Sequence, residues 1–169
     1  MLLRGEKNMK AYLANGLFSL ADRMFNDYLA AYVRKHISDI ELYVPQENAE
    51  INDKNAYADS MMIANGDDQY LKEADFMIAV IDGVEIDSGV ACEIGVITTL
   101  GKPVFALYTD VRQMGRDNQD KIDALIEDAT ENQFMYRNLY VIGKIKNSGG
   151  KIVSSLEDLV TAIKEYYSQ

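Results

Sequence analysis

Residues 73–108 read EADFMIAVIDGVEIDSGVACEIGVITTLGKPVFALY, and this stretch decides the fold. Residues 76–81 form a short, unbroken apolar run, which is typical of a strand buried on both faces of a parallel sheet. An acidic loop follows over residues 82–87, and apolar residues then recur at helical spacing up to a Gly-Lys-Pro turn. Residues 104–108 form a second buried strand, so the stretch predicts two parallel strands joined by a helix.

Carboxylates gather where this unit is expected to bind a ligand. Asp82, Glu85 and Asp87 lie in the loop after the first strand. Glu93 follows on the helix, about 100° round from Ile94 and therefore at the margin of the packed face. In open α/β sheets, ligands bind outside the carboxyl ends of the strands. The loop and Glu93 are therefore the first candidates for a functional site.

The rest of the chain extends this alternation of strands and helices. Further strands are expected at residues 10–14, 40–44 and 151–154, helices at 20–35, 57–74 (with a potential break at Asn65-Gly66), 122–129, 134–145 and 156–167 (capped by Ser155), and loops at 46–54 and 109–118. This order predicts a three-layer α/β fold of the flavodoxin or Rossmann type, with a five-stranded, mostly parallel sheet and helices on both faces. Residues 1–8 precede a second methionine, so we expect a disordered N-terminal extension followed by a single domain over residues 9–169.

The composition limits the ligands that the protein can bind. A net charge of −10 disfavours nucleic acid and anionic membranes, because both attract clusters of Lys and Arg. One cysteine excludes an internal disulfide, the single histidine leaves no Cys/His cluster for zinc, and no apolar run is long enough to cross a membrane. No G-x-G-x-x-G motif follows the first strand, which disfavours a flavin or dinucleotide cofactor. We therefore expect a cytoplasmic protein that binds a small molecule.

Four motifs resemble those of a known enzyme family. Residues 87–95, DSGVACEIG, match a D-x-G-x-A-x-E-x-G signature, and residues 12–19, YLANGLFS, resemble a Y-x-A-G-P-x-F strand and loop. Asp67 stands eight residues before Asp75, as in a D-(x)7-D stretch, and Asn138-Leu139 resembles a late N-L motif. In this order the four motifs resemble the nucleoside 2-deoxyribosyltransferase family.

The resemblance extends over residues 9–167 and implies a set of substrate contacts. They are Tyr12, Asn15, Gly16, Phe18, Gly89 and Asn138. Family members usually carry Gly-Pro where this chain has Asn15-Gly16, so the shape of the sugar pocket is expected to differ there. Asn138 is expected to reach across an interface between subunits and to hydrogen-bond the sugar or position Glu93. The resemblance therefore implies a homo-oligomer built from dimers, either a dimer or a hexamer, and the apolar residues 135–145 fit an interface helix.

Glu93 is the candidate nucleophile. Cleavage of an N-glycosidic bond builds positive charge on the sugar, and a carboxylate that faces the anomeric carbon can stabilise or attack it. The helix dipole is expected to keep Glu93 ionised, and Gly89, one turn below, leaves room for the sugar ring. Asp67 or Asp87, held among other carboxylates, is expected to have a raised pKa and to donate a proton to the departing base.

The family implies transfer of the 2-deoxyribosyl group between purine or pyrimidine bases without a cofactor, as in deoxyribonucleoside salvage. The base leaves, the deoxyribosyl group stays on Glu93 as an ester, and a second base collects it with retained configuration. In related nucleotide N-glycosidases, a serine near the 5'-phosphate stands six residues before the glutamate. Asp87 stands there in this chain, and its charge would repel a phosphate, which favours nucleosides as substrates.

Two alternatives from other classes stay open. The same residues would serve a hydrolase that cleaves 2'-deoxynucleosides or deoxynucleotides with water as the acceptor. The third hypothesis is a non-catalytic module that binds a nucleoside-like ligand, because a charged residue on a helix is by default a solvated surface residue. Incubation with deoxyinosine, with and without adenine, separates the three. Exchange that needs the second base indicates a transferase, free deoxyribose without it indicates a hydrolase, and no reaction indicates the binding module.

Overall fold

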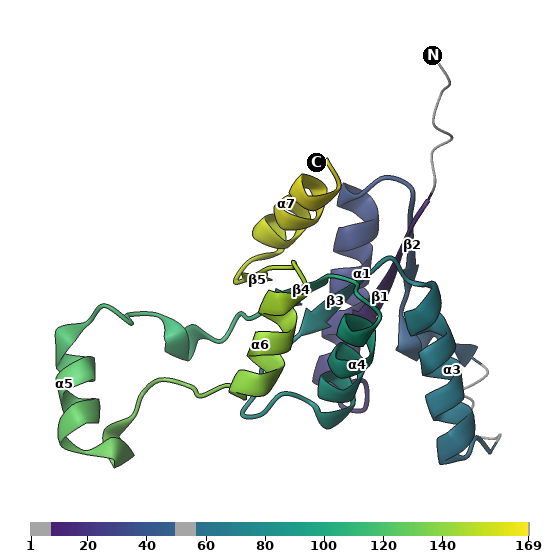
Figure 1. Ribbon diagram of the computed structural model, residues 1–169. Helices are drawn as coiled ribbons and strands as arrows, with labels where there is room; N and C mark the ends of the chain where they lie inside the picture. Colours follow the sequence, from purple (N-terminus) through teal and green to yellow (C-terminus); the bar gives the residue numbers. More distant parts are fainter. Residues whose placement is uncertain (1–7, 50–56, 169) are drawn as a thin grey trace.

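A five-stranded parallel sheet forms the centre of the computed structural model, which describes residues 8–49 and 57–168 (Figure 1). Its strands are β1 (Met9–Ala14), β2 (Ile40–Tyr43), β3 (Phe76–Val80), β4 (Val104–Leu107) and β5 (Ile152–Val153). They lie in the order β2-β1-β3-β4-β5, and every neighbouring pair is parallel, so the predicted fold class is confirmed. Of the predicted N-terminal extension only Asn8 is among the described residues, and the predicted loop over 46–54 is described only up to residue 49.

Helices cover both faces of the sheet (Figure 1), which explains the apolar runs in its strands. α1 (Leu20–His36) and α7 (Leu156–Tyr167) pack on one face, and α3 (Ser60–Glu73), α4 (Ser88–Thr99) and α6 (Leu139–Asn147) pack on the other. Successive strand side chains point to opposite faces, so Leu13 joins the first core and Tyr12 joins the second. Within residues 8–49 and 57–168, no helix is long and apolar enough to cross a bilayer.

Side-chain caps set where the helices begin. Asp59 caps α3, and Ser155 caps α7 as predicted. Ser19 and Asp22 form a reciprocal capping box at the start of α1. Each cap satisfies backbone N–H groups that have no partner within their own helix. α3 runs unbroken through Asn65-Gly66, so the potential break does not occur.

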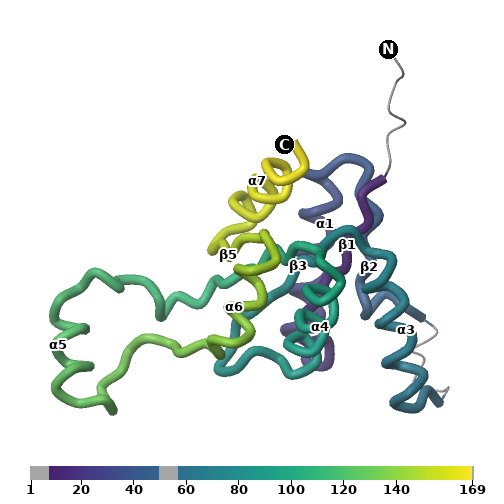
Figure 2. The backbone as a smooth tube through the Cα atoms, viewed as in Figure 1, coloured from purple at the N-terminus to yellow at the C-terminus, as the bar shows by residue number. Residues whose placement is uncertain are grey.

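Residues 114–135 leave the body of the molecule as an arm between β4 and α6 (Figure 2). η2 (Val111–Gln113) lies at its base. The arm carries α5 (Gln119–Glu127) and η3 (Ala129–Glu131), which pack on each other. The predicted loop over residues 109–118 therefore contains the short helix η2 and leads into this projection.

The expectation of an apolar helix over residues 134–145 is wrong at its start, because α6 begins at Leu139. The Asn138 side chain accepts hydrogen bonds from the backbone N–H groups of Tyr140 (3.0 Å) and Val141 (3.3 Å). An asparagine used as a cap has non-helical backbone angles, so it separates the apolar residues before it from the helix after it. The helix then buries Val141 and Ile145 against α4 and the sheet.

Candidate active site

A cavity of about 190 Å³ opens beside the carboxyl ends of β1 and β3. The loops after β1, β2 and β3 and the facing sides of α3 and α4 form its wall. The lining residues are Asn15, Gly16, Leu17, Phe18, Pro45, Ile63, Asp67, Asp87, Gly89, Val90 and Glu93. All three predicted catalytic carboxylates therefore share one cavity, together with four of the six predicted substrate contacts.

Glu93 points into this cavity from α4 and is held from below by Tyr12. The Tyr12 hydroxyl, which is fully buried beneath the site, donates a hydrogen bond of 2.6 Å to Glu93 Oε1. Burial raises the pKa of Glu93 to about 7; the charges of Asp67 and Asp87 add to the shift, and the Tyr12 hydroxyl opposes it. The expectation that the helix dipole keeps Glu93 ionised is therefore wrong in direction, because burial, the largest cause of the shift, raises the pKa.

Asp67 reaches the same cavity from the opposite wall, since it lies on α3. Partial burial raises its pKa, the neighbouring charge of Asp68 adds to the rise, and the Tyr12 hydroxyl opposes it. A carboxyl group with a raised pKa retains a proton that it can donate. Asp67 therefore shares the cavity of Glu93 with a pKa above its ordinary value.

Asp87 marks the point where α4 begins. Its side chain accepts a hydrogen bond of 3.0 Å from the backbone N–H of Val90 and so caps the helix. A Cβ atom on Gly89 would lie 3.1 Å from Asp87 Oδ1, which is tighter than ordinary contacts between these atoms. The glycine thus leaves room beside the Asp87 carboxylate in the wall of the cavity.

An aromatic stack supports Tyr12 from the side. The ring of Tyr43 lies 5.3 Å from the ring of Tyr12 and stacks on Tyr70 at 3.6 Å, between ring centroids. Asn48 donates a hydrogen bond of 3.1 Å to the Tyr43 hydroxyl. Burial raises the pKa of Tyr43 to about 12, so this phenol stays neutral beside the carboxylates. Nothing in the sequence pattern singled out Tyr43, because its role depends on the neighbours that β2 meets in the sheet.

Asn26 fixes the loop that carries Asn15 and Gly16. Its side chain is buried on α1; the side-chain oxygen accepts from Asn15 Nδ2 (2.8 Å), and the nitrogen donates to the Gly16 carbonyl (3.0 Å) and to Gln46 Oε1 (2.8 Å). The sequence analysis missed this residue. Its signal was present, because Asn26 shares the buried face of α1 with Leu29 and Val33, where a polar side chain needs a partner.

Two further predicted substrate contacts differ in position, since Phe18 lies at the rim of the Glu93 cavity and Asn138 lies outside it. Phe18 stands at the rim of the Glu93 cavity with 85% of its side chain exposed. Asn138 lines a different cavity, of about 720 Å³, together with Ile86, Ala91 and Arg137. Within one chain, Asn138 is therefore not part of the cavity that holds Glu93.

Asn138 retains one hydrogen-bonding group for another partner. Its side-chain oxygen caps α6, and within the described residues its amide nitrogen makes no hydrogen bond. The amide therefore has two N–H groups to offer. Over residues 8–49 and 57–168, no group of three or more His, Cys, Asp or Glu side chains is arranged to hold a metal ion.

The chain is similar to known proteins over most of its length. The model of the family described as nucleoside 2-deoxyribosyltransferase matches residues 11–139. The crystal structure of a conserved protein from Enterococcus faecalis V583 is 53% identical with a TM-score of 0.89, and the alignment covers 95% of this chain and 99% of that chain. No curated protein matches.

Two structures of lower identity share the fold. A 2-deoxyribosyltransferase from Bacillus psychrosaccharolyticus is 20% identical with a TM-score of 0.62, over 89% of this chain and 90% of that chain. A 2-deoxyribosyltransferase from Leishmania mexicana is 19% identical with a TM-score of 0.59, over 95% of this chain and 98% of that chain. Because the family model spans most of the sequence, the chain belongs to the nucleoside 2-deoxyribosyltransferase family.

Proposed function

We propose that the protein transfers the 2-deoxyribosyl group between nucleobases of 2'-deoxyribonucleosides through a covalent intermediate on Glu93. The observation that carries this proposal is the pairing of Glu93 with the buried Tyr12 hydroxyl in a cavity shared with Asp67 and Asp87. A carboxylate held by one donor and flanked by carboxyl groups suits a reaction that builds positive charge on the sugar. Membership of the family supports the same class of reaction.

The first step breaks the bond between the sugar and the first base. A carboxylate oxygen of Glu93 attacks C1' of the sugar, the C1'–N bond breaks, and the electron pair of that bond goes to the base. Asp67 donates its proton to a nitrogen of the departing base, so that the base leaves neutral. The product is a deoxyribosyl ester on Glu93.

The second step regenerates the protein. A nitrogen of a second base attacks C1' while the Asp67 carboxylate accepts the proton of that nitrogen, and the ester bond to Glu93 breaks. Two inversions at C1' give net retention. Because Asp87 lines the cavity with a negative charge, we expect a free 5'-hydroxyl to be accepted and a 5'-phosphate to be repelled.

We further propose that Asn138 acts in the cavity of a neighbouring subunit, in a homo-oligomer built from dimers. Leu139 and Tyr140, which adjoin Asn138, are 82% and 76% exposed in a single chain. Large apolar side chains in such positions favour contact with another protein surface. With its oxygen occupied by the helix cap, Asn138 would donate an N–H group to the sugar or to the neighbour's Glu93.

The test is base exchange on deoxyinosine. With adenine present we expect deoxyadenosine and hypoxanthine, and without a second base we expect little free deoxyribose. Glu93→Ala should abolish the exchange while thermal unfolding shows an intact fold. Equal release of deoxyribose with and without adenine would assign a hydrolase instead, and substantial exchange by Glu93→Ala would remove Glu93 from the mechanism.

A further inference from the structure

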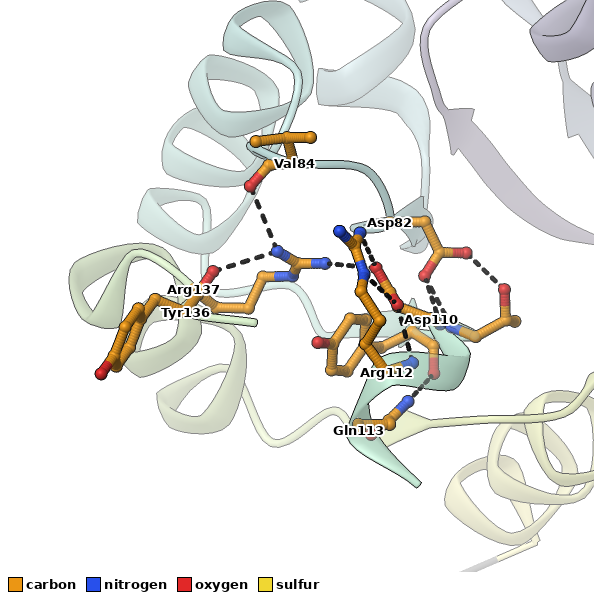
Figure 3. Close-up of polar contacts among 9 residues, drawn as sticks. Asp82, Val84, Asp110, Arg112, Gln113, Tyr136 and Arg137 are labelled. Carbon is orange, nitrogen blue, oxygen red and sulfur yellow. Dashed lines mark hydrogen bonds and ion pairs between the residues drawn. The ribbon is translucent and has the colours of Figure 1, made fainter. Parts of the chain in front are cut away.

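A buried ion pair that the proposed reaction does not use closes the base of the arm (Figure 3). The side chains of Arg137 and Asp110 are 7% and 9% exposed, and Arg137 Nη2 lies 3.6 Å from Asp110 Oδ2. The Arg137 guanidinium also lies over the ring of Tyr108, 4.5 Å from its centroid. Asp110 precedes the arm in the sequence and Arg137 follows it, so the pair joins the two ends of one projection.

The same cluster ties three loops together at the carboxyl edge of the sheet (Figure 3). Arg137 Nη1 donates to the carbonyl of Val84, after β3, at 3.4 Å. Asp82 accepts hydrogen bonds from the backbone N–H groups of Thr109 (2.6 Å) and Asp110 (3.1 Å), after β4. The segment before α6 is therefore held in position by the loops that follow β3 and β4.

Arginines at both ends of the arm contact the Asp110 carboxylate. Arg112 donates to Asp110 through Nε at 2.9 Å, and Arg137 approaches the same carboxylate from the other end. The pKa of Asp110 is lowered to about 2. The hydrogen bond from Arg112 is the largest cause, and the charges of Arg112 and Arg137 contribute. Asp110 is therefore ionised at any pH at which the protein would work.

The geometry of this pair suits positioning better than stabilisation. The distance between Arg137 and Asp110 is long for an ion pair, and within the described residues Arg137 Nε and Nη2 are buried without a hydrogen bond. Buried ion pairs contribute net stability only when the geometry is close and the remaining donors are satisfied. The Arg137–Asp110 pair therefore loses hydration without a full set of hydrogen bonds in exchange, so its role is better explained by the segments that it holds in place.

We propose that Asp110 and Arg137 are positioning residues that present Asn138 to the active cavity of a second copy of the chain. This inference rests on the proposed function. Asn138 follows Arg137 directly and caps α6, so the clamp on Arg137 sets where the free Asn138 amide lies. The side chains of Arg137 and Asp110 are only 7% and 9% exposed in their own chain, so the pair acts on the neighbour's site through Asn138 and touches no substrate.

Subunit complementation tests this proposal directly. Arg137→Met alone should lower base exchange at least tenfold, and Glu93→Ala alone should abolish it. When both chains are coexpressed, a mixed dimer holds one intact site, made of Glu93 from the Arg137→Met copy and the clamp and Asn138 from the Glu93→Ala copy. Random pairing through a two-fold interface should then restore about one quarter of wild-type exchange.

Two further variants guard against a simple folding defect. Asp110→Asn keeps the shape of its side chain but removes the charge, and it should complement Glu93→Ala in the same way. Arg137→Lys keeps a positive charge and should retain more exchange than Arg137→Met. Thermal unfolding and solution mass confirm that each variant is folded and assembled.

The possible results separate the inference from the function it depends on. If wild-type protein shows no base exchange, the proposed function fails before any variant is tested. If Asn138→Ala complements Glu93→Ala but neither Arg137→Met nor Asp110→Asn does, the shared site stands and the positioning role is overturned. Full exchange by Arg137→Met on its own would overturn it as well.

Discussion

At the scale of single residues, the contact between Tyr12 and Glu93 controls the charge of the nucleophile. Glu93 must be ionised to attack, and its pKa is raised to about 7, so kcat/KM for exchange should rise as the pH passes through about 7. The groups around Glu93 push this pKa in opposite directions. Removing one group or another should therefore shift the pH profile in opposite directions, which can be tested.

Tyr12→Phe and Asp67→Asn should move that rise in opposite directions. Loss of the Tyr12 hydroxyl removes a hydrogen bond that stabilises the carboxylate, so the rise should move to higher pH. The ionised form of Asp67 raises the pKa of Glu93, so loss of this carboxyl should move the rise to lower pH. The maximal rate should fall as well, because the reactive form, with Glu93 ionised and the proton on Asp67, can no longer form. The measurement is kcat/KM against pH for the three proteins, and shifts of the same sign would contradict this description of the site.

The residue scale also shows where the sequence was insufficient. The motifs pointed to Glu93, Asp67 and Asp87, and the structure brings them together in one cavity. The direction of the Glu93 pKa was missed, because helix position is visible in a sequence whereas burial beside Asp67 depends on how α3 and α4 pack. Tyr43 was missed for the same reason, since only pairing of β1 with β2 brings it beside Tyr12.

At the scale of elements, the strands were the easiest to predict. β3 and β4 are buried on both faces, so their sequences are continuous apolar runs that cannot be confused with surface segments. The start of α6 was harder, because Phe134, Met135 and Tyr136 carry the apolar character of the helix without belonging to it. A local cap by Asn138 decides the boundary, and it also explains why the free amide points away from the helix backbone.

Asn26 connects an element to the site, because it ties the loop after β1 to α1. Asn26→Leu keeps the branching of the side chain but leaves Asn15 Nδ2 and the Gly16 carbonyl without their partner. We expect KM for the nucleoside to rise several-fold while kcat changes less, since Glu93 and Asp67 keep their own supports. Steady-state kinetics with a thermal unfolding control check this, and Asn26→Asp, which retains an acceptor for Asn15, should show a smaller effect. An unchanged KM in Asn26→Leu would show that the loop does not contact the substrate.

At the scale of the whole molecule, the proposed shared site links activity to assembly. A single chain carries Glu93 in one cavity and Asn138 in another. The arm projects between β4 and α6, and Asn138 lies where the chain returns from the arm to α6. If each site needs two copies, exchange activity per chain should fall on dilution in parallel with the loss of dimers. Analytical ultracentrifugation and initial rates over the same concentration range measure both quantities, and constant activity through full dissociation would show that one chain suffices.

The most direct test of the central claim is the covalent state of Glu93 during turnover. Wild-type protein is mixed with deoxyinosine in the absence of an acceptor base, quenched in acid, digested and analysed by mass spectrometry. We expect one deoxyribosyl group on the peptide that contains Glu93, no such adduct in Glu93→Gln, and loss of the adduct when adenine is added before the quench. Base exchange without any adduct on wild-type protein, or with the adduct on a different peptide, would contradict the proposed mechanism.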